Sequence, residues 1–316
     1  MKLLLNILSP VRFFGMYLSI ALVLIALTGT FSRGLNLGID FTGGFITEYS
    51  TSESLKQSDM QKHLQSLIEN KFVLTSAERG TNWTVRQPDI AADQIAGNNL
   101  TSKSWLKELQ QLSFFEEQNI KVELLDSDYI GSQIGQELID QGGLAMLTAL
   151  IIILVYLSAR FEWRFALGAV LALFHDVIVV IGIFAWTQLE FNLTVLASIL
   201  AIIGYSLNDS IIVADRIRET MKLNKNNNLS SVINLAVLST MTRTLITSGT
   251  TLATILSLWW LAGMPLQGFS VALFFGILVG TFSSVCISAT FPEVVGLDVN
   301  FYKLKELEKK EILEGD

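Results

Sequence analysis

Six apolar runs, each about as long as a bilayer is thick, constrain this chain of 316 residues more than any other feature. A membrane-spanning helix needs about 20 mostly apolar residues, because the hydrocarbon core is about 30 Å thick. Residues 244–292 include no Asp, Glu, Lys or Arg, and the whole chain is 16% charged, against about 25% in an average soluble domain. The sequence therefore predicts a polytopic α-helical membrane protein with transmembrane helices at 13–31, 142–158, 165–186, 192–214, 244–262 and 268–291.

A polar block, residues 33–141, separates the first run from the second and is long enough to form a domain. Its apolar residues alternate in some segments and recur every three or four residues in others, which indicates strands and helices respectively. The resulting order, β-α-β-β-α-β, fits an α+β ferredoxin-like module. The predicted strands are 45–49, 72–76, 83–86 and 120–124, and the predicted helices are 54–70 and a segment around Trp105 and Leu109.

The positions of Lys and Arg predict the orientation of the chain, because short cytoplasmic loops carry an excess of these residues. The basic residues beside the runs all fall on one side, whereas the connections 187–191 and 263–267 carry none. Both termini are therefore expected in the cytoplasm, with the polar block outside. The expected divisions are 1–32 for the N-terminus and first span, 33–141 for the outer domain, 142–292 for a five-helix bundle and 293–316 for a cytoplasmic tail. A cytoplasmic connection is expected at 215–243, with a short interfacial amphipathic helix at 229–241.

Several classes of function are excluded by what the sequence lacks. A disulfide within the chain is excluded, because Cys286 is its one cysteine. The chain has two histidines, His63 and His175, and they are too far apart in the sequence to form a recognisable metal motif. The polar block has more acids than bases, which argues against a nucleic-acid surface. The apolar runs show no nucleophile–base pair, so an enzyme is not expected, and neither is a cofactor.

Asp209 is the first candidate for a functional residue. It lies within the run that starts near Phe191, and a carboxylate in a membrane helix costs about 2.5–3.5 kcal/mol at the bilayer centre. Such a residue is a candidate site for titration by protons or sodium ions. The competing interpretation is an interfacial acid that points to water. Tyr205, one turn earlier, shares its face, and Asn208 is a further supporting candidate.

Arg243, at the start of the next run, is the expected partner of Asp209, since both belong near the same depth on adjacent spans. The alternative is an arginine that snorkels to the cytoplasmic boundary. The hydroxyl-bearing residues after it, among them Thr247 and Ser248, either bond between helices, help to coordinate an ion, or allow close packing with Gly249.

Two further motifs are candidates for supporting roles. His175 and Asp176 lie near the middle of the third run, where an acid and an imidazole form either a proton relay or a buried pair that fixes helix register. The stretch 38–44, Gly-Ile-Asp-Phe-Thr-Gly-Gly, is expected to be a tight structural turn into the outer domain. Its motif residues are Gly38, Asp40, Gly43 and Gly44.

Four segments together resemble the SecF family of protein-export membrane subunits, within the SecD/SecF group of the resistance–nodulation–division superfamily. They are the stretch 38–44, Arg-Phe-Glu-Trp-Arg at 160–164, Gly-Tyr-Ser-Leu-Asn-Asp-Ser-Ile-Ile-Val-Ala-Asp-Arg-Ile-Arg-Glu at 204–219 and Arg-Thr-Leu-Ile-Thr-Ser-Gly-Thr-Thr at 243–251. The resemblance extends from about residue 11 to residue 291.

The resemblance implies six spans in the bacterial inner membrane, with the outer domain in the periplasm. It implies a SecD-like partner subunit, association with the SecYEG translocon and a YajC-like subunit, and an unfolded preprotein as the translocated chain. Transported H⁺ or Na⁺ would drive movements of the periplasmic domain that assist translocation. The essential acid and arginine of the family fall on Asp209 and Arg243.

Two alternatives of other classes are a small-molecule efflux transporter half and a passive assembly scaffold. Six spans with one outer domain argue against the first, since efflux members of this superfamily typically carry twelve spans and two outer domains. Substitution of Asp209 separates a motor from a scaffold, because a scaffold would tolerate the loss of the carboxylate.

Overall fold

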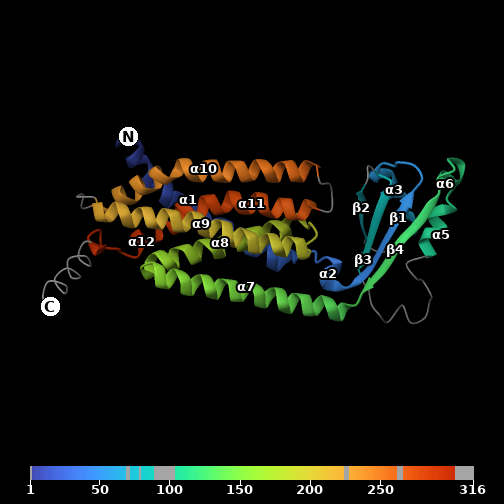
Figure 1. Ribbon diagram of the computed structural model, residues 1–316, viewed down its shortest axis with the longest axis horizontal. Helices are drawn as coiled ribbons and strands as arrows, with labels where there is room; N and C mark the ends of the chain where they lie inside the picture. The colour runs from blue at the N-terminus through green and yellow to red at the C-terminus, as the bar shows by residue number, and fades with distance from the viewer. Residues whose placement is uncertain are drawn as a thin grey trace.

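The computed structural model describes residues 2–68, 72–77, 80–88, 104–223, 228–261 and 266–302. A long helical bundle makes up most of the molecule, and a small sheet domain lies beyond one end of it (Figure 1). We call the end of the bundle beside the sheet domain the proximal end. The start of α1 (Lys2–Arg33) and the short helix α12 (Phe291–Val294) both lie near the opposite, distal end (Figure 1).

Six helices of the described part are long and apolar enough to cross a membrane, which confirms the predicted number of spans. The first five are longer than their apolar runs, because helical structure continues into the flanking residues, whereas the sixth span combines α11 with the short segments that follow it. The helices are α1 (Lys2–Arg33), α7 (Ser132–Arg160), α8 (Trp163–Thr187), α9 (Leu193–Leu223), α10 (Leu229–Leu261) and α11 (Gln267–Ser283). A π-helical segment, η2 (Ser284–Ser288), and the short α12 (Phe291–Val294) follow α11.

Helices α8, α9 and α11 form the centre of the bundle, while α7 and α10 run along opposite sides of it (Figure 1). Buried apolar side chains of the central helices, such as Phe184, Ile199 and Val271, form one continuous core. Gly276 allows α11 to approach α9, since a Cβ there would lie 2.3 Å from a carbon of Ile202. Most of α7 is exposed and apolar, which suits a surface in contact with lipid.

The sheet domain has the predicted β-α-β-β-α-β order. Its antiparallel sheet has the strand order β2-β3-β1-β4, as in a ferredoxin-like module. Helices α3 and α5 cover one face, and the core between them includes Trp83, Met60 and Leu109. The strands are β1 (Gly44–Thr51), β2 (Val73–Ala77), β3 (Asn82–Pro88) and β4 (Val122–Ile130), and the helices are α3 (Gln57–Leu67), α5 (Ser104–Gln110) and α6 (Ser113–Glu117).

Two predictions about local structure are wrong. The interfacial helix expected at 229–241 is not a separate element, because α10 runs without a break from Leu229 to Leu261. The expected connection at 215–243 is accordingly helical at both ends, and its central residues 224–227 lie outside the described residues.

The stretch 38–44 is not a simple turn, since it contains the four-residue helix α2 (Ile39–Thr42) before β1 begins. The expected tail, 293–316, is described as far as residue 302.

Candidate functional site

Asp209 lies on α9, and its side chain is 3% exposed. Among the residues that the structure describes, its Oδ2 atom has no hydrogen-bond partner, and the buried Oγ atoms of Ser210 and Thr244 also have none. An unpaired polar atom in an apolar bundle costs free energy, because no water replaces the missing partner. Unpaired atoms on the adjacent helices α9 and α10 are available to a ligand or to groups from outside the described residues.

Arg243 lies on α10, and its side chain is exposed. Its charge acts on the Asp209 carboxylate. In the described part of the chain, however, Arg243 forms no ion pair with Asp209 within 4.0 Å. The two residues therefore lie on helices that pack against each other, without a direct bond between them.

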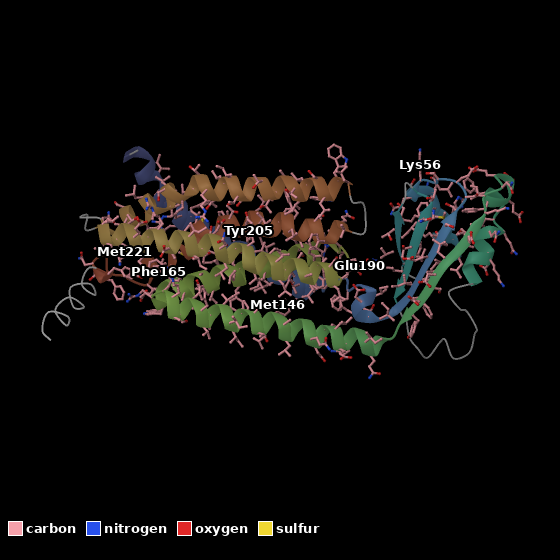
Figure 2. The ribbon with its side chains drawn as sticks, viewed as in Figure 1. Lys56, Met146, Phe165, Glu190, Tyr205 and Met221 are labelled. Carbon is pink, nitrogen blue, oxygen red and sulfur yellow. The ribbon has the colours of Figure 1, made fainter. Side chains whose placement is uncertain are left out.

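The predicted hydroxyl-bearing residues divide into two groups. Ser248 connects three helices, because its Oγ lies 2.8 Å from Thr281 Oγ1 on α11 and 3.4 Å from the Tyr205 hydroxyl on α9. Figure 2 shows Tyr205 about halfway along the bundle. Thr247 instead donates to carbonyl oxygens of its own helix, at Arg243 and Thr244, so its hydroxyl does not join two helices.

Beside the Asp209 site, α9 and α10 expose a face of small and polar residues, which we call the open face. On α9 it includes Gly204 and Asn208, and on α10 it includes Gly249 and Thr250. A Cβ atom built at either glycine would meet nothing within 4 Å, so the described part of the chain does not cover them. Small residues let the backbones of two membrane helices approach closely, and the open face is therefore suited to another helix.

His175 and Asp176 form a separate polar cluster on α8. Asp176 is completely buried, and its carboxylate accepts hydrogen bonds from two serine hydroxyls and lies beside an imidazole nitrogen. Ser206 Oγ of α9 donates at 2.6 Å, Ser283 Oγ of α11 donates at 2.9 Å, and His175 Nδ1 lies 3.0 Å from the carboxylate. The pair thus fixes three central helices relative to one another, as the predicted buried pair would.

The motif residues Gly38 and Asp40 connect the sheet domain to the start of α9. Asp40 Oδ2 accepts a hydrogen bond from the Leu193 backbone N–H at 3.0 Å, which caps the first turn of α9. The Gly38 N–H donates to the Phe191 carbonyl at 2.8 Å, and the Phe191 N–H donates to the Asn36 carbonyl at the same distance. A cap of this type contributes about 1 kcal/mol to stability. The helix that carries Asp209 is therefore anchored at its proximal end by residues that lead directly into β1.

Glycine is required at several positions of this junction. Gly43 adopts a φ of 75° and Gly44 a φ of 147°, which residues with a side chain rarely adopt. At Gly38 a Cβ would lie 2.6 Å from Oε1 of Glu190 in the loop before α9, so any larger residue there requires the Glu190 side chain to move. Gly43, just before β1, and Gly44, its first residue, thus set the direction in which the chain enters the sheet.

Glu190 is a member of the junction that the sequence analysis missed. It lies at the proximal end of the bundle, in the loop between α8 and α9 (Figure 2). Partial burial raises the pKa of its carboxyl group, the charge of Arg86 on β3 lowers it, and the charge of Asp40 raises it further. The signal for Glu190 was its position as the only acid in a short connection between two predicted spans.

Arg12 is a second residue whose role the sequence did not show. It was interpreted as a basic residue at the membrane boundary, but it is completely buried within α1. Its guanidinium donates to Asn234 Oδ1 at 2.8 Å and to Thr290 Oγ1 at 3.2 Å, and it pairs with Glu293 at 2.9 Å. The network joins α1 to α10 and α12 near the distal end.

In the described residues no group of three His, Cys, Asp or Glu side chains is placed to hold a metal ion.

Comparisons with known proteins agree with this geometry. Residues 110–296 match the family described as "Protein export membrane protein SecD/SecF, C-terminal", and residues 28–51 match the "SecD/SecF GG Motif". The second match contains the junction around Gly38 and Asp40. The chain is 39% identical over 270 residues to the protein translocase subunit SecF of Pseudomonas aeruginosa, with 85% of each chain covered. It is 36% identical over 278 residues to the SecF of Escherichia coli O157:H7, with 88% of this chain and 84% of the relative covered.

Solved structures show the same arrangement. The crystal structure of SecDF from Thermus thermophilus, described as a translocon-associated membrane protein, superposes with a TM-score of 0.72 and 32% identity over 92% of this chain. A super-membrane-facing form of SecDF superposes with a TM-score of 0.69 and 31% identity over 93% of this chain. The chain spans 38% of the first of these solved chains and 39% of the second. The match to more than half of the chain, together with these relatives, establishes that the chain belongs to the SecD/SecF family of protein-export membrane proteins, in its SecF branch.

Proposed function

We propose that this protein is the SecF-like half of an ion-driven motor that assists preprotein translocation across the bacterial inner membrane. Asp209 holds the transported H⁺ or Na⁺, and Arg243 supplies the opposing charge. The observation that carries the proposal is one carboxylate oxygen of Asp209, which is buried without a partner among the described residues, on a helix whose Gly204 those residues leave uncovered. An unpaired carboxylate oxygen is suited to exchange an ion.

A SecD-like subunit covers the open face in this proposal. The SecDF relatives carry a further region in the same chain, which is absent from the residues matched here. Helices of that partner would pack against Gly204 and Gly249 and would enclose the charges of Asp209 and Arg243 in a site shielded from lipid. The SecYEG translocon and a YajC-like subunit are the further proposed partners.

The junction at Asp40 gives a route from the ion site to the sheet domain. A shift of α9 on ion binding would move its capped first turn, and the α2 segment would pass that movement to β1. One ion that crosses about 100 mV releases about 2.3 kcal/mol, which is enough to change the balance between states separated by a few kcal/mol. In the proposed orientation both termini lie in the cytoplasm, and the sheet domain lies in the periplasm beside the emerging unfolded preprotein.

The test is translocation of a preprotein into inverted inner-membrane vesicles that contain the Asp209→Asn variant with its partner subunits. We expect assembly to persist and ion-stimulated translocation to fall to the level of vesicles without the complex. The control is Asp215→Asn, which removes an exposed acid that lies six residues further along the same helix and pairs with Arg160. If vesicles with Asp209→Asn translocate preprotein at the unsubstituted rate, the proposed ion-driven motor is contradicted, and the passive scaffold is the remaining interpretation.

The driving ion is determined by the same vesicles. Selective collapse of the pH gradient should stop the stimulation if protons are used, and collapse of a sodium gradient should stop it if sodium is used. Stimulation that survives both treatments would contradict an ion-driven mechanism.

A further inference from the structure

Two short connections join the sheet domain to the bundle, and they lie side by side. The first is Gly43, between α2 and β1, and the second is Gly131, between β4 and α7. They are neighbours because β1 and β4 are paired, with Gly44 at the start of β1 opposite Ile130 at the end of β4. Hinges are usually a few residues at the ends of such elements. Two neighbouring connections define a single axis, about which the sheet domain can turn relative to the bundle.

Arg86 of β3 lies close to this axis. It is opposite Ile46 of β1, and Pro88, two residues later, is opposite Gly44. Side chains alternate along a strand, so Arg86 points away from the domain core, which contains Val85. Arg86 is partly buried, and among the described residues its guanidinium has no acidic partner within 4.0 Å. An arginine is charged at every physiological pH and has several N–H donors, so this one is available to an acceptor.

Glu190 lies on the bundle side of the same junction (Figure 2). Backbone hydrogen bonds hold its loop against the segment before α2, since Phe191 accepts from the Gly38 N–H and donates to the Asn36 carbonyl, both at 2.8 Å. The Glu190 carboxylate itself lies against Gly38, where a Cβ would be 2.6 Å from its Oε1. Helix α2 follows Gly38 directly and packs against β3, which brings the carboxylate and Arg86 to the same junction.

Direct bonds do not match the charges at this junction. Glu190 is partly buried, and in the part of the chain that the structure describes it forms no ion pair within 4.0 Å. The charge of Arg86 attracts its carboxylate, and the charge of Asp40 repels it. Asp40 already accepts a hydrogen bond from the Leu193 N–H at 3.0 Å, which leaves Glu190 as the acid best placed to bind Arg86. A guanidinium–carboxylate bond is charge-assisted and often bidentate, so contact between the two would satisfy an unpaired charge on each side of the junction.

We propose that Arg86 and Glu190 form a latch between the sheet domain and the bundle. The latch is open in the arrangement described here. It closes when the sheet domain turns about the connections at Gly43 and Gly131 and the guanidinium binds the carboxylate directly. The closed pair holds β3 against the loop that leads into α9, the helix of Asp209.

The strength of the pair suits a latch that opens and closes. A partly solvated ion pair contributes little to stability, so it is made and broken easily. The completely buried Arg12, which pairs with Glu293, is instead costly to separate from its partner. A shift of α9 on ion binding would move the loop that carries Glu190 and so open or close the latch. The inference rests on the proposed function for this purpose alone.

The test measures the distance between the two parts of the full chain, assembled with its SecD-like partner in nanodiscs. Spin labels are attached at Ser32→Cys on α1 and Lys62→Cys on α3, two exposed positions, in a background with Cys286→Ser. Double electron–electron resonance should show two populations, one at the separation in this structure and a second for the closed latch. A single population that no charge substitution alters would overturn the proposal.

Substitution on either side of the junction should deplete the second population. Arg86→Gln and Glu190→Gln should each lower the ratio of closed to open molecules about fivefold. Arg86→Lys should keep most of the closed population, because the charge remains. If Arg86→Gln lowers the ratio and Glu190→Gln leaves it unchanged, Arg86 binds another group, such as a lipid phosphate, and the latch is contradicted.

Reversal of both charges tests whether the two residues act on each other. Arg86→Glu combined with Glu190→Arg should restore the ratio that each single reversal lowers. Should a reversed variant fail to fold, the contrast between Arg86→Lys and Arg86→Gln still decides the question. Equal effects of these two substitutions would contradict an ion pair.

Lys121→Gln is the matched control. Lys121 is exposed just before β4, at the end of the sheet opposite to the hinge, where its backbone bonds Ser52. Loss of this charge should leave the ratio of closed to open molecules unchanged. A fall equal to that in Arg86→Gln would show that the net charge of the domain, rather than one pair, sets its orientation.

The Asp209→Asn variant separates this inference from the proposed function, because the distance measurement needs no ion gradient. If the charge substitutions change the ratio while Asp209→Asn translocates preprotein normally, the latch stands and the motor fails. If Asp209→Asn abolishes ion-stimulated translocation while neither Arg86→Gln nor Glu190→Gln changes the ratio, the motor stands and the latch fails.

Discussion

The two faces of α9 differ in how their polar groups are satisfied. On the face toward α8 and α11, Ser206 donates to Asp176, whose carboxylate also accepts from Ser283 and lies 3.0 Å from His175 Nδ1. On the face toward α10, Asp209 keeps one oxygen without a partner among the described residues. Both carboxylates belong to a membrane bundle, where an unsatisfied group has no water to bond. The difference indicates that the carboxylate of Asp176 is satisfied within this subunit, whereas that of Asp209 is suited to a further group from outside it.

The Arg12 network is a further complete site, and its loss should have the largest effect on stability. Arg12→Ala leaves Glu293 without its partner and opens a buried space between α1, α10 and α12. Removal of one partner from a buried ion pair costs about 3–5 kcal/mol. We expect a correspondingly lower unfolding midpoint in detergent, measured by circular dichroism.

Arg160→Ala is the matched control for Arg12→Ala. Arg160 pairs with Asp215 at 3.4 Å, but both side chains are exposed. An exposed pair contributes about 0–1 kcal/mol, so this variant should unfold close to the parent chain. Equal decreases in the unfolding midpoint of the two variants would show that the buried network contributes no more to stability than an exposed ion pair.

Substitution on the open face should affect assembly and leave the subunit intact. Gly204→Leu meets nothing within this chain but fills the space into which a partner helix would pack. Affinity for a SecD-like subunit should fall about tenfold or more, which corresponds to about 1.4 kcal/mol. The measurement is titration of the labelled subunits in nanodiscs, with circular dichroism to confirm that the variant is folded.

The control for the open face is Gly143→Leu on α7, where a Cβ atom also meets nothing within 4 Å. That glycine is exposed among apolar side chains of α7, which we assign to lipid. Its substitution should leave the affinity unchanged. A loss of affinity only in Gly143→Leu would place the partner on the opposite side of the bundle and overturn the comparison.

The smallest expected effect concerns the junction at the proximal end. Because burial raises the pKa of Glu190 in the folded state, the folded chain binds a proton there more strongly than the unfolded chain. The folded state therefore loses stability as the pH rises from the ordinary pKa of the Glu190 carboxyl, 4.5, to its higher pKa in the folded chain. Above that higher pKa the carboxyl is charged in both states, and the free energy of unfolding no longer changes with pH through this group.

Glu190→Gln should remove this pH dependence and raise the melting temperature at neutral pH by about 2 °C. The comparison is between thermal melts of the variant and the parent at neutral pH and near pH 4.5. Glu48→Gln, an exposed acid on β1, is the control and should alter neither melt. A variant less stable than the parent at neutral pH would show that the attraction of Arg86 outweighs burial.

The amino-acid sequence by itself determined the six spans, the sheet domain and the position of Asp209 and Arg243 on adjacent helices. Those features follow from local pattern, because bilayer thickness fixes the length of an apolar run and alternation fixes the faces of a strand. The sequence could not show that no ion pair joins Asp209 and Arg243. The continuation of α10 through residues 229–241 was missed, since a polar stretch that extends a membrane helix resembles an interfacial helix.

Tertiary structure alone decided which polar residues have partners. Asp40 caps a helix that starts 153 residues later in the chain, and Arg12 bonds residues more than 200 positions away. Neither contact leaves a local signal, because a cap or an ion pair is recognised from sequence only when its members are close along the chain. The same packing left His175 Nε2 and Asp209 Oδ2 without a partner among the described residues. Whether a buried polar group finds a partner depends on how helices that are distant in the sequence pack together, and no local pattern contains that information.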